Sequence, residues 1–147
     1  MSIPKVEPEA YKVMAAFDKY LDSTMLTRVH KDLIKIRTSQ VNGCAFCIDK
    51  HNFEAREAGE TEQRIYALSV WRDTPFFTEE EKAILALTEE VTLIGNHVSD
   101  QTYDQAVGLL GEKKVAQSIM AIISMNAWNR IGITTRMQPS IRQPALN

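Results

Sequence analysis

The sequence predicts an all-α protein, and three observations carry this prediction. Apolar residues recur three and four residues apart in several segments, which is the spacing of one face of a helix. Residues that cap helices stand before many of these segments, and glycines follow several of them. No segment alternates apolar and polar residues as a half-buried strand does. We therefore expect about seven helices and no sheet.

The expected helices, in chain order, span about residues 8–21, 25–40, 44–59, 61–71, 78–96, 100–111 and 112–131. Pro8 fits the first turn of the first helix, where its missing N–H costs nothing. Asp22-Ser23 interrupts this helix and is expected to cap the second. Asn42-Gly43 ends the second helix because both residues tolerate left-handed geometry, and Gly59 ends the third.

Capping residues delimit the fourth and fifth helices. Thr61 is expected to cap the fourth helix, and residues 72–75 are expected to form a loop after it. Thr78 followed three residues later by Glu81 is a capping box, in which each side chain bonds to the other residue's backbone N–H. The fifth helix should therefore begin just after Thr78.

The last two helices are separated by a glycine. Ser99 or Asp100 is expected to cap the sixth helix, which Gly111 ends. The seventh helix follows directly. The segment 132–147 contains two prolines and is expected to be an irregular tail.

Length and composition predict one domain, which spans 1–147. The 147 residues are within the usual size of a single domain, and 44% apolar residues suffice for a core without disulfides. The 17 basic and 19 acidic residues leave a net charge of −2. This balance excludes a basic footprint for nucleic acid and a polybasic patch for a membrane surface.

The N-terminal segment predicts a cytoplasmic location. Two prolines and two glutamates interrupt the first nine residues, where a signal peptide would need a continuous apolar stretch. No window approaches the length of a membrane span. In a reducing compartment, two cysteines are catalytic, redox-active or metal-binding more often than they are structural.

Three reactive side chains fall within eight residues: Cys44, Cys47 and His51. Their separations of three and four residues place them on one face of a helix, with Glu54 at the edge of that face. The first turn of a helix favours a thiolate through its unpaired N–H groups and its dipole. A Cys-x-x-Cys pair and a protonated histidine also lower a thiol pKa. His51 can then serve as a base for Cys47.

A thiolate beside a second thiol suits the reduction of a peroxide. The thiolate attacks the O–O bond and becomes a sulfenic acid, and the second thiol condenses with it to form a disulfide. A donor must then reduce that disulfide. Three other readings stay open: a dithiol–disulfide redox protein or sensor, a helical module with structural thiols, and a zinc site. A zinc site needs a fourth ligand, and neither a second Cys-x-x-Cys nor a His pair is present.

The run from Leu33 to Cys47, with His51 and the segment 55–60, resembles the alkylhydroperoxidase AhpD-like, or carboxymuconolactone decarboxylase-like, superfamily. The similarity continues through residues 71–77, 87–89 and 126–130. This resemblance implies an all-helical fold that assembles as a homo-oligomer, often a trimer or hexamer. The resemblance covers a core of about residues 25–137 and implies peroxidase activity through the cysteine pair. We expect the protein to reduce alkyl or hydrogen peroxide without a bound cofactor or metal, and we expect a thiol or lipoyl donor to reduce its disulfide.

The resemblance also implies roles for individual residues. Cys47 corresponds to the cysteine that is oxidised, Cys44 to the resolving thiol, and His51 to part of a proton relay. The superfamily's relay begins with a glutamate twelve residues before the first cysteine, where this chain has the shorter acid Asp32. The best-known peroxidase has a histidine directly before the second cysteine, where this chain has Phe46. The lactone decarboxylases lack the cysteine pair, so its presence argues against decarboxylation.

Overall fold

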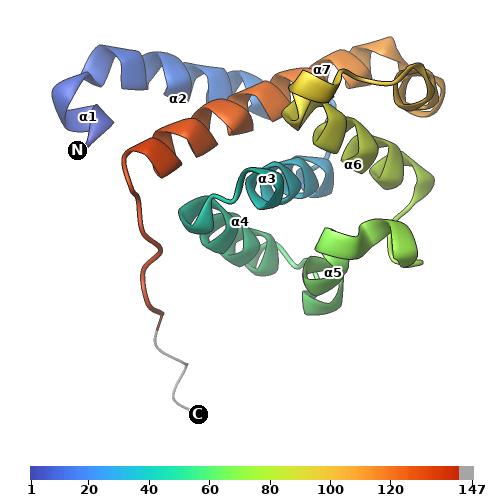
Figure 1. The fold of residues 1–147 in the computed structure, drawn as a ribbon, viewed down its shortest axis with the longest axis horizontal. Helices are drawn as coiled ribbons and strands as arrows, with labels where there is room; N and C mark the ends of the chain where they lie inside the picture. Colours follow the sequence, from blue (N-terminus) through green and yellow to red (C-terminus); the bar gives the residue numbers. More distant parts are fainter. Residues whose placement is uncertain (143–147) are drawn as a thin grey trace.

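The computed structural model describes residues 1–142 and confirms the all-α prediction (Figure 1). The helices are α1 (Ile3–Val6), α2 (Pro8–Asp22), α3 (Arg28–Asn42), α4 (Ala45–Glu57), α5 (Glu62–Ala67), the 3-10 helix η1 (Leu68–Asp73), α6 (Glu79–Thr92), the 3-10 helix η2 (Ile94–Asn96) and α7 (Asp100–Thr134). No strand forms within these 142 residues.

The helix α3 lies at the centre of the fold and packs against α4, α6 and α7 (Figure 1). The helix α2 lies along α7, on the other side of that long helix from α6 in the view of Figure 1. One apolar core fills the space between α2, α3, α6 and α7, and its buried members are Leu21, Leu26, Ile34, Ile84, Leu87, Ala106, Val115, Ala121 and Ile122. A second core lies under η1 and includes Leu33, Ile36, Leu68 and Leu85.

Most of the predicted caps are confirmed, and one is wrong. The side chains of Thr61 and Ser99 accept bonds from the N–H three residues on, and the capping box of Thr78 is complete. The residue that caps α3 is Thr27, whose hydroxyl accepts from the His30 N–H, and not the predicted Asp22-Ser23. The chain between α2 and Thr27 is a turn, so α3 begins three residues later than predicted.

The two predicted helices at 100–111 and 112–131 form one element, α7, which is broken at the predicted glycine. Gly111 has φ 76° and ψ 154°, a conformation outside the helical region that glycine adopts without strain. The helix continues to Thr134, so the expected irregular tail begins three residues later than predicted. Residues 143–147 of that tail lie outside the described residues.

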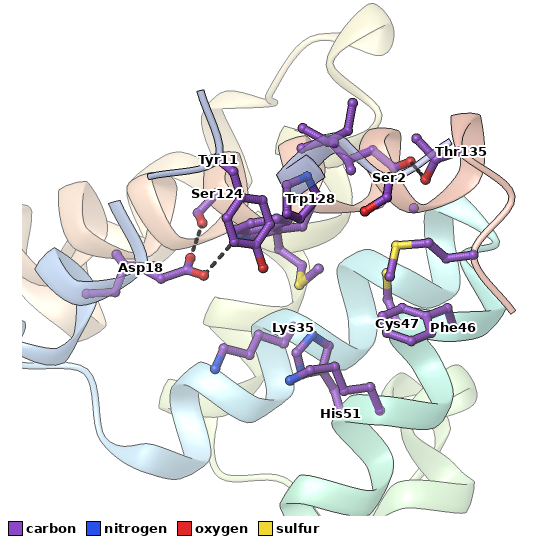
Figure 2. A pocket seen from close by; sticks show the side chains of 18 of the residues that line it. Ser2, Tyr11, Asp18, Lys35, Phe46, Cys47, His51, Ser124, Trp128 and Thr135 are labelled. Atoms are coloured by element: carbon purple, nitrogen blue, oxygen red, sulfur yellow. Dashed lines mark hydrogen bonds between the residues drawn. The ribbon is translucent and has the colours of Figure 1, made fainter. Parts of the chain in front are cut away.

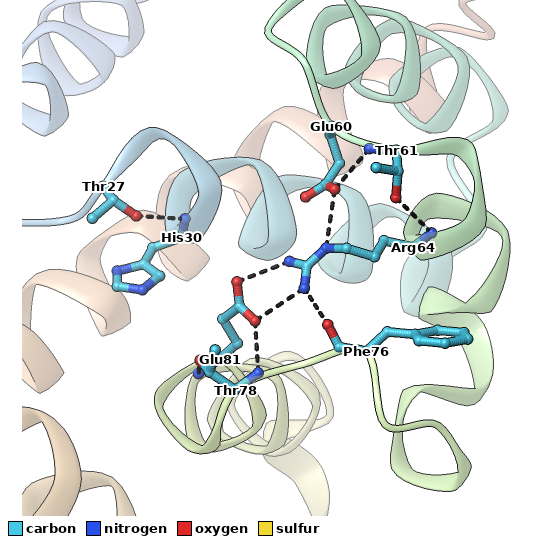
Figure 3. A network of polar contacts seen from close by, with 8 residues as sticks. All are labelled: Thr27, His30, Glu60, Thr61, Arg64, Phe76, Thr78 and Glu81. Carbon is cyan, nitrogen blue, oxygen red and sulfur yellow. Dashed lines mark hydrogen bonds and ion pairs between the residues drawn. The ribbon is translucent and has the colours of Figure 1, made fainter.

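A half-buried guanidinium joins α5 to α6. Arg64 donates to the Glu60 carboxylate. Its two terminal nitrogens donate to the two oxygens of Glu81, and the distance from Nη2 to Oε1 is 2.8 Å (Figure 3). Glu81 is also the acidic member of the capping box, so one carboxylate fixes both the start of α6 and the position of α5. Charge-assisted bonds of this kind hold elements in a defined geometry.

The described helices do not meet the requirements of a membrane span. Although α7 is 35 residues long, neither it nor any other described helix contains the apolar window that a membrane crossing requires.

Candidate functional site

The backbone before α4 places the first cysteine at the helix entrance. Gly43 ends α3 in the left-handed region, with φ 70°. The chain then reverses, and the Cys44 N–H donates to the Ser39 carbonyl at 3.0 Å. Cys44 is the N-cap of α4, and its carbonyl accepts from the Ile48 N–H at 2.9 Å. The predicted stripe is therefore present, with Cys47 inside the first turn and Cys44 one step before it.

Cys44 and Cys47 form a disulfide with Cα atoms 5.3 Å apart, and both residues are buried. Gly132 of α7 lies against this bridge. A Cβ at that position would lie 3.2 Å from the Cys44 sulfur and 3.5 Å from the Cys47 sulfur. The absence of a side chain at Gly132 thus allows α7 to approach the dithiol. Met125 of α7 completes the buried cluster around the two sulfurs.

A cavity of about 490 Å³ opens next to the disulfide (Figure 2). It is bounded by α1, α2, α3, α4 and the C-terminal half of α7. Cys47 lines this cavity and Cys44 does not. The side chain of Phe46 also lines it, as expected for an apolar ring at this position. The geometry therefore distinguishes the two sulfurs by access, with Cys47 facing the open space.

His51 lines the same cavity one turn after Cys47. Its Nδ1 lies 2.8 Å from a carboxylate oxygen of Glu54, which is itself paired with Lys50. A carboxylate can only accept, so this contact assigns the proton to Nδ1 and leaves the Nε2 lone pair available as a base. The sequence predicted Glu54 at the edge of the stripe, without a role. Its spacing of three residues after His51 was the signal for one.

Burial decides the charge of His51. Desolvation lowers the pKa of His51 to about 4, although the hydrogen bond to Glu54 opposes this change. The imidazole is therefore neutral near pH 7 in the disulfide form. The expected influence of a protonated histidine on the thiol is absent in this form, and the base role fits instead. For Glu54, burial raises the pKa, but hydrogen bonds from Lys50 and His51 outweigh it and lower the pKa overall.

Asp32 is buried on α3, but it is not among the residues that line the cavity beside Cys47. Its carboxylate accepts from Arg28 Nε at 2.6 Å, and it lines a separate space of about 10 Å³. Burial raises the pKa of Asp32, while Arg28 opposes that rise. The structure thus brings Cys44, Cys47 and His51 together and shows no contact between Asp32 and these three. A relay role for Asp32 stays a prediction.

A buried polar network lies behind the dithiol. The Asn42 side chain donates to the amide oxygens of Asn126 at 3.0 Å and Asn129 at 2.9 Å, and Asn129 donates to the Ser39 hydroxyl at 3.1 Å. This network connects the end of α3, where the chain turns into Cys44, to α7. Asn129 is fully buried, so the network holds the cysteine loop against α7 through satisfied bonds.

Glu89 belongs to a different cluster. Its carboxylate accepts from Arg37 Nε and Trp71 Nε1, each at 2.8 Å, and from Arg72. These donors come from α3 and η1, so the cluster joins those elements to α6. As for metal ligands, the described part of the chain holds no group of three or more His, Cys, Asp or Glu side chains arranged for an ion.

Comparison with known proteins places this geometry in a family. Residues 8–90 match the carboxymuconolactone decarboxylase family. The uncharacterized protein YdfG of Bacillus subtilis is 43% identical over 134 residues, which cover 90% of this chain and 91% of YdfG. Among solved structures, ATU0492 from Agrobacterium tumefaciens superposes with a TM-score of 0.93 at 36% identity, covering 97% of this chain and 98% of that one. ATU0492 is named a protein of unknown function, with the antioxidant defence protein AhpD as its suggested assignment.

A more distant structure shares the fold alone. The debrominase Bmp8 superposes with a TM-score of 0.83 at 18% identity, covering 90% of this chain and 72% of Bmp8. The family match covers more than half of the chain, and two relatives exceed one third identity over nearly their full length. The helical chain with its dithiol at the start of α4 belongs to the carboxymuconolactone decarboxylase family, within the AhpD-like superfamily.

Proposed function

We propose that this protein is a thiol peroxidase that reduces alkyl hydroperoxides through Cys47 and Cys44. The observation that carries the proposal is the unequal access of the two sulfurs: Cys47 lines the cavity, and Cys44 lies behind it against Gly132. A nucleophile must meet the substrate, whereas a resolving thiol needs only to reach the nucleophile. The disulfide between them is the product expected at the end of the oxidative half-reaction.

The proposed reaction begins with the reduced dithiol. His51 Nε2 takes the proton of the Cys47 thiol, and the thiolate attacks the terminal oxygen of the hydroperoxide. The O–O bond breaks, the sulfur becomes a sulfenic acid, and the leaving alkoxide takes a proton from His51 to depart as an alcohol. The Cys44 thiol then attacks the sulfenic sulfur, and the disulfide forms with release of water.

The first turn of α4 supports the thiolate. Cys47 is the third residue of the helix, where the backbone N–H groups lack partners within the helix and the dipole favours negative charge. Glu54 is a positioning residue, because its carboxylate holds the His51 tautomer that presents a base to the cavity. Regeneration requires two electrons and two protons from an external dithiol, such as a lipoyl group, through thiol–disulfide exchange.

The test is a thiol count and intact mass before and after one equivalent of cumene hydroperoxide. Reduced wild-type protein is expected to lose both free thiols. Its mass should fall by two hydrogens, with no oxygen added. The Cys44→Ser variant is expected to accumulate a sulfenic acid that a dimedone reagent traps, and Cys47→Ser to stay unmodified. Thiols that survive excess peroxide in the wild type would overturn the proposal.

The second candidate is a dithiol–disulfide redox protein that uses the same pair without peroxide. The closed disulfide beside an accessible sulfur favours it. The two candidates separate in one experiment. Fast reduction and reoxidation by a dithiol and disulfide pair, together with inertness to hydroperoxides, would support this second function over the first.

A further inference from the structure

The cavity beside Cys47 has an apolar wall. Six apolar side chains from four helices contribute to it: Ile3, Leu21, Phe46, Met125, Trp128 and Ile131. A space of about 490 Å³ falls in the range that holds small organic ligands. Burying apolar surface against such a wall stabilises a ligand with a hydrocarbon body. The shape and lining therefore predict a substrate that is larger and more apolar than hydrogen peroxide.

Two lysines of α3 line the same cavity. Lys31 and Lys35 are four residues apart, so they lie on one face of the helix, and both are half-buried. Neither has an ion-pair partner within 4.0 Å in residues 1–142, although Lys31 Nζ lies 3.4 Å from the Leu21 carbonyl oxygen. Like charges at this spacing repel each other, and an anion between them relieves that repulsion.

The protein's own carboxylate in the cavity does not neutralise these lysines. Among the described residues that line the cavity, Asp18 is the acidic one. Its two carboxylate oxygens accept from the Ser124 hydroxyl at 2.7 Å and from Trp128 Nε1 at 2.9 Å. Figure 2 shows Lys35 beside His51, across the pocket from Trp128. Lys50, the third lysine of the lining, differs because it is paired with Glu54. Asp32, on the same helix, is ion-paired with Arg28 and interacts with Lys35 only beyond ion-pair distance, so the charge of Lys31 and Lys35 stays available to a ligand.

We propose that the cavity binds an apolar carboxylic acid, with its carboxylate on Lys31 and Lys35 and its hydrocarbon chain against the wall formed by Phe46, Met125 and Trp128. The peroxide that reacts at Cys47 is then the hydroperoxide of such an acid. This second statement rests on the proposed peroxidase function, whereas the binding of the acid does not. The reaction is the one given above, and its product is the hydroxy acid.

The binding experiment uses linoleic acid and its methyl ester, which differ only in charge, with oxidised wild-type protein and calorimetry below the aggregation concentration of each lipid. The acid is expected to bind roughly tenfold more tightly than the ester, a difference within the range of charge-assisted hydrogen bonds from two half-buried lysines. The Lys31→Gln/Lys35→Gln double variant should bring the two dissociation constants within about twofold of each other. Lys113→Gln, an exposed lysine that does not line the cavity, should keep the preference.

The turnover experiment uses the hydroperoxides of the same acid and ester with reduced protein. The acid is expected to have the higher kcat/KM, mainly through KM, and the double variant should lose this preference. Equal binding of acid and ester by the wild type, or a preference that survives the double substitution, would overturn the inference. Acid-selective binding without reaction of either hydroperoxide would reject the peroxidase function while keeping the anion site.

Discussion

Glu54 and His51 are one helical turn apart on α4, and the 2.8 Å contact between the Glu54 carboxylate and His51 Nδ1 orients the imidazole toward the cavity of Cys47. Because the carboxylate accepts, the ring presents Nε2 as the base. Glu54, about two helical turns after Cys47, thus acts on the first turn of α4 through His51.

Replacing Glu54 with Gln is expected to slow the oxidation of Cys47 by hydroperoxide by about 10–100-fold, because the amide no longer fixes one tautomer. The pH profile of the oxidation rate should also change, since the charge beside His51 is lost. Stopped-flow measurement of thiol loss checks both effects. Glu57→Gln, an exposed acid of the same helix, is the control and should react as the wild type does. An unchanged pH profile in Glu54→Gln would show that Glu54 has no positioning role.

Burial of neutral His51 makes the stability of the oxidised protein depend on pH. The folded pKa of about 4 lies below the ordinary value of 6.5, so the unfolded chain binds more protons between these two pH values. Stability from this residue is therefore present above pH 6.5 and is lost as the pH falls toward 4, by about 3 kcal/mol in total. Urea unfolding at several pH values measures the loss.

The His51→Gln variant provides the comparison for that measurement. Its free energy of unfolding should fall less steeply than that of the wild type between pH 6.5 and pH 4. Parallel curves for the two proteins would assign the acid sensitivity to other groups.

Replacing Gly132 with Ala is expected to destabilise the protein by about 1–3 kcal/mol, because the new Cβ crowds the Cys44 sulfur at 3.2 Å. The matched control is Gly108→Ala, also within α7, where nothing lies within 4 Å of the added carbon. That control should stabilise the helix by roughly 0.5–1 kcal/mol. Thermal unfolding of both oxidised variants shows whether each substitution lowers or raises the stability. Stabilisation of Gly132→Ala would show that α7 can shift away from the dithiol.

Truncating Asn129 to Ala is expected to cost about 1–3 kcal/mol, since it leaves the Asn42 amide and the Ser39 hydroxyl with fewer partners in a buried site. The loop that carries Cys44 should loosen as well, and hydrogen exchange of the Cys44 amide, which bonds to the Ser39 carbonyl, reports on it. Equal exchange rates of the Cys44 amide in the variant and the wild type would show that the asparagine network does not stabilise the loop.

Asp32→Asn tests the relay that the superfamily resemblance implies. Because Asp32 bonds to Arg28 and is absent from the lining of the cavity, we expect its substitution to slow Cys47 oxidation less than Glu54→Gln does. Peroxide kinetics on the two variants side by side make the comparison. A larger effect in Asp32→Asn would restore the relay role to that residue.

Short-range physics determined what the sequence revealed by itself. Helical periodicity, the caps at Thr61, Thr78 and Ser99, and the break at Gly111 depend on residues within one turn of each other, so their patterns were legible. The same holds for the Cys44, Cys47 and His51 stripe, whose members share one helix face. The cap of α3 was misplaced because Asp22-Ser23 and Thr27 offer equivalent cap chemistry, and the structure shows that the Thr27 hydroxyl is the one that accepts from the His30 N–H.

Tertiary packing decided the rest of the candidate site. The contact of Gly132 with the sulfurs joins residues more than eighty positions apart, and only the approach of α7 to α4 creates it. The cavity likewise forms only where α1, α2, α3, α4 and α7 meet, so no pattern in the sequence showed that Lys31 and Lys35 line the same cavity as Cys47. The burial that lowers the pKa of His51 depends on every neighbour in space, and so does the placement of Asp32 in a separate space.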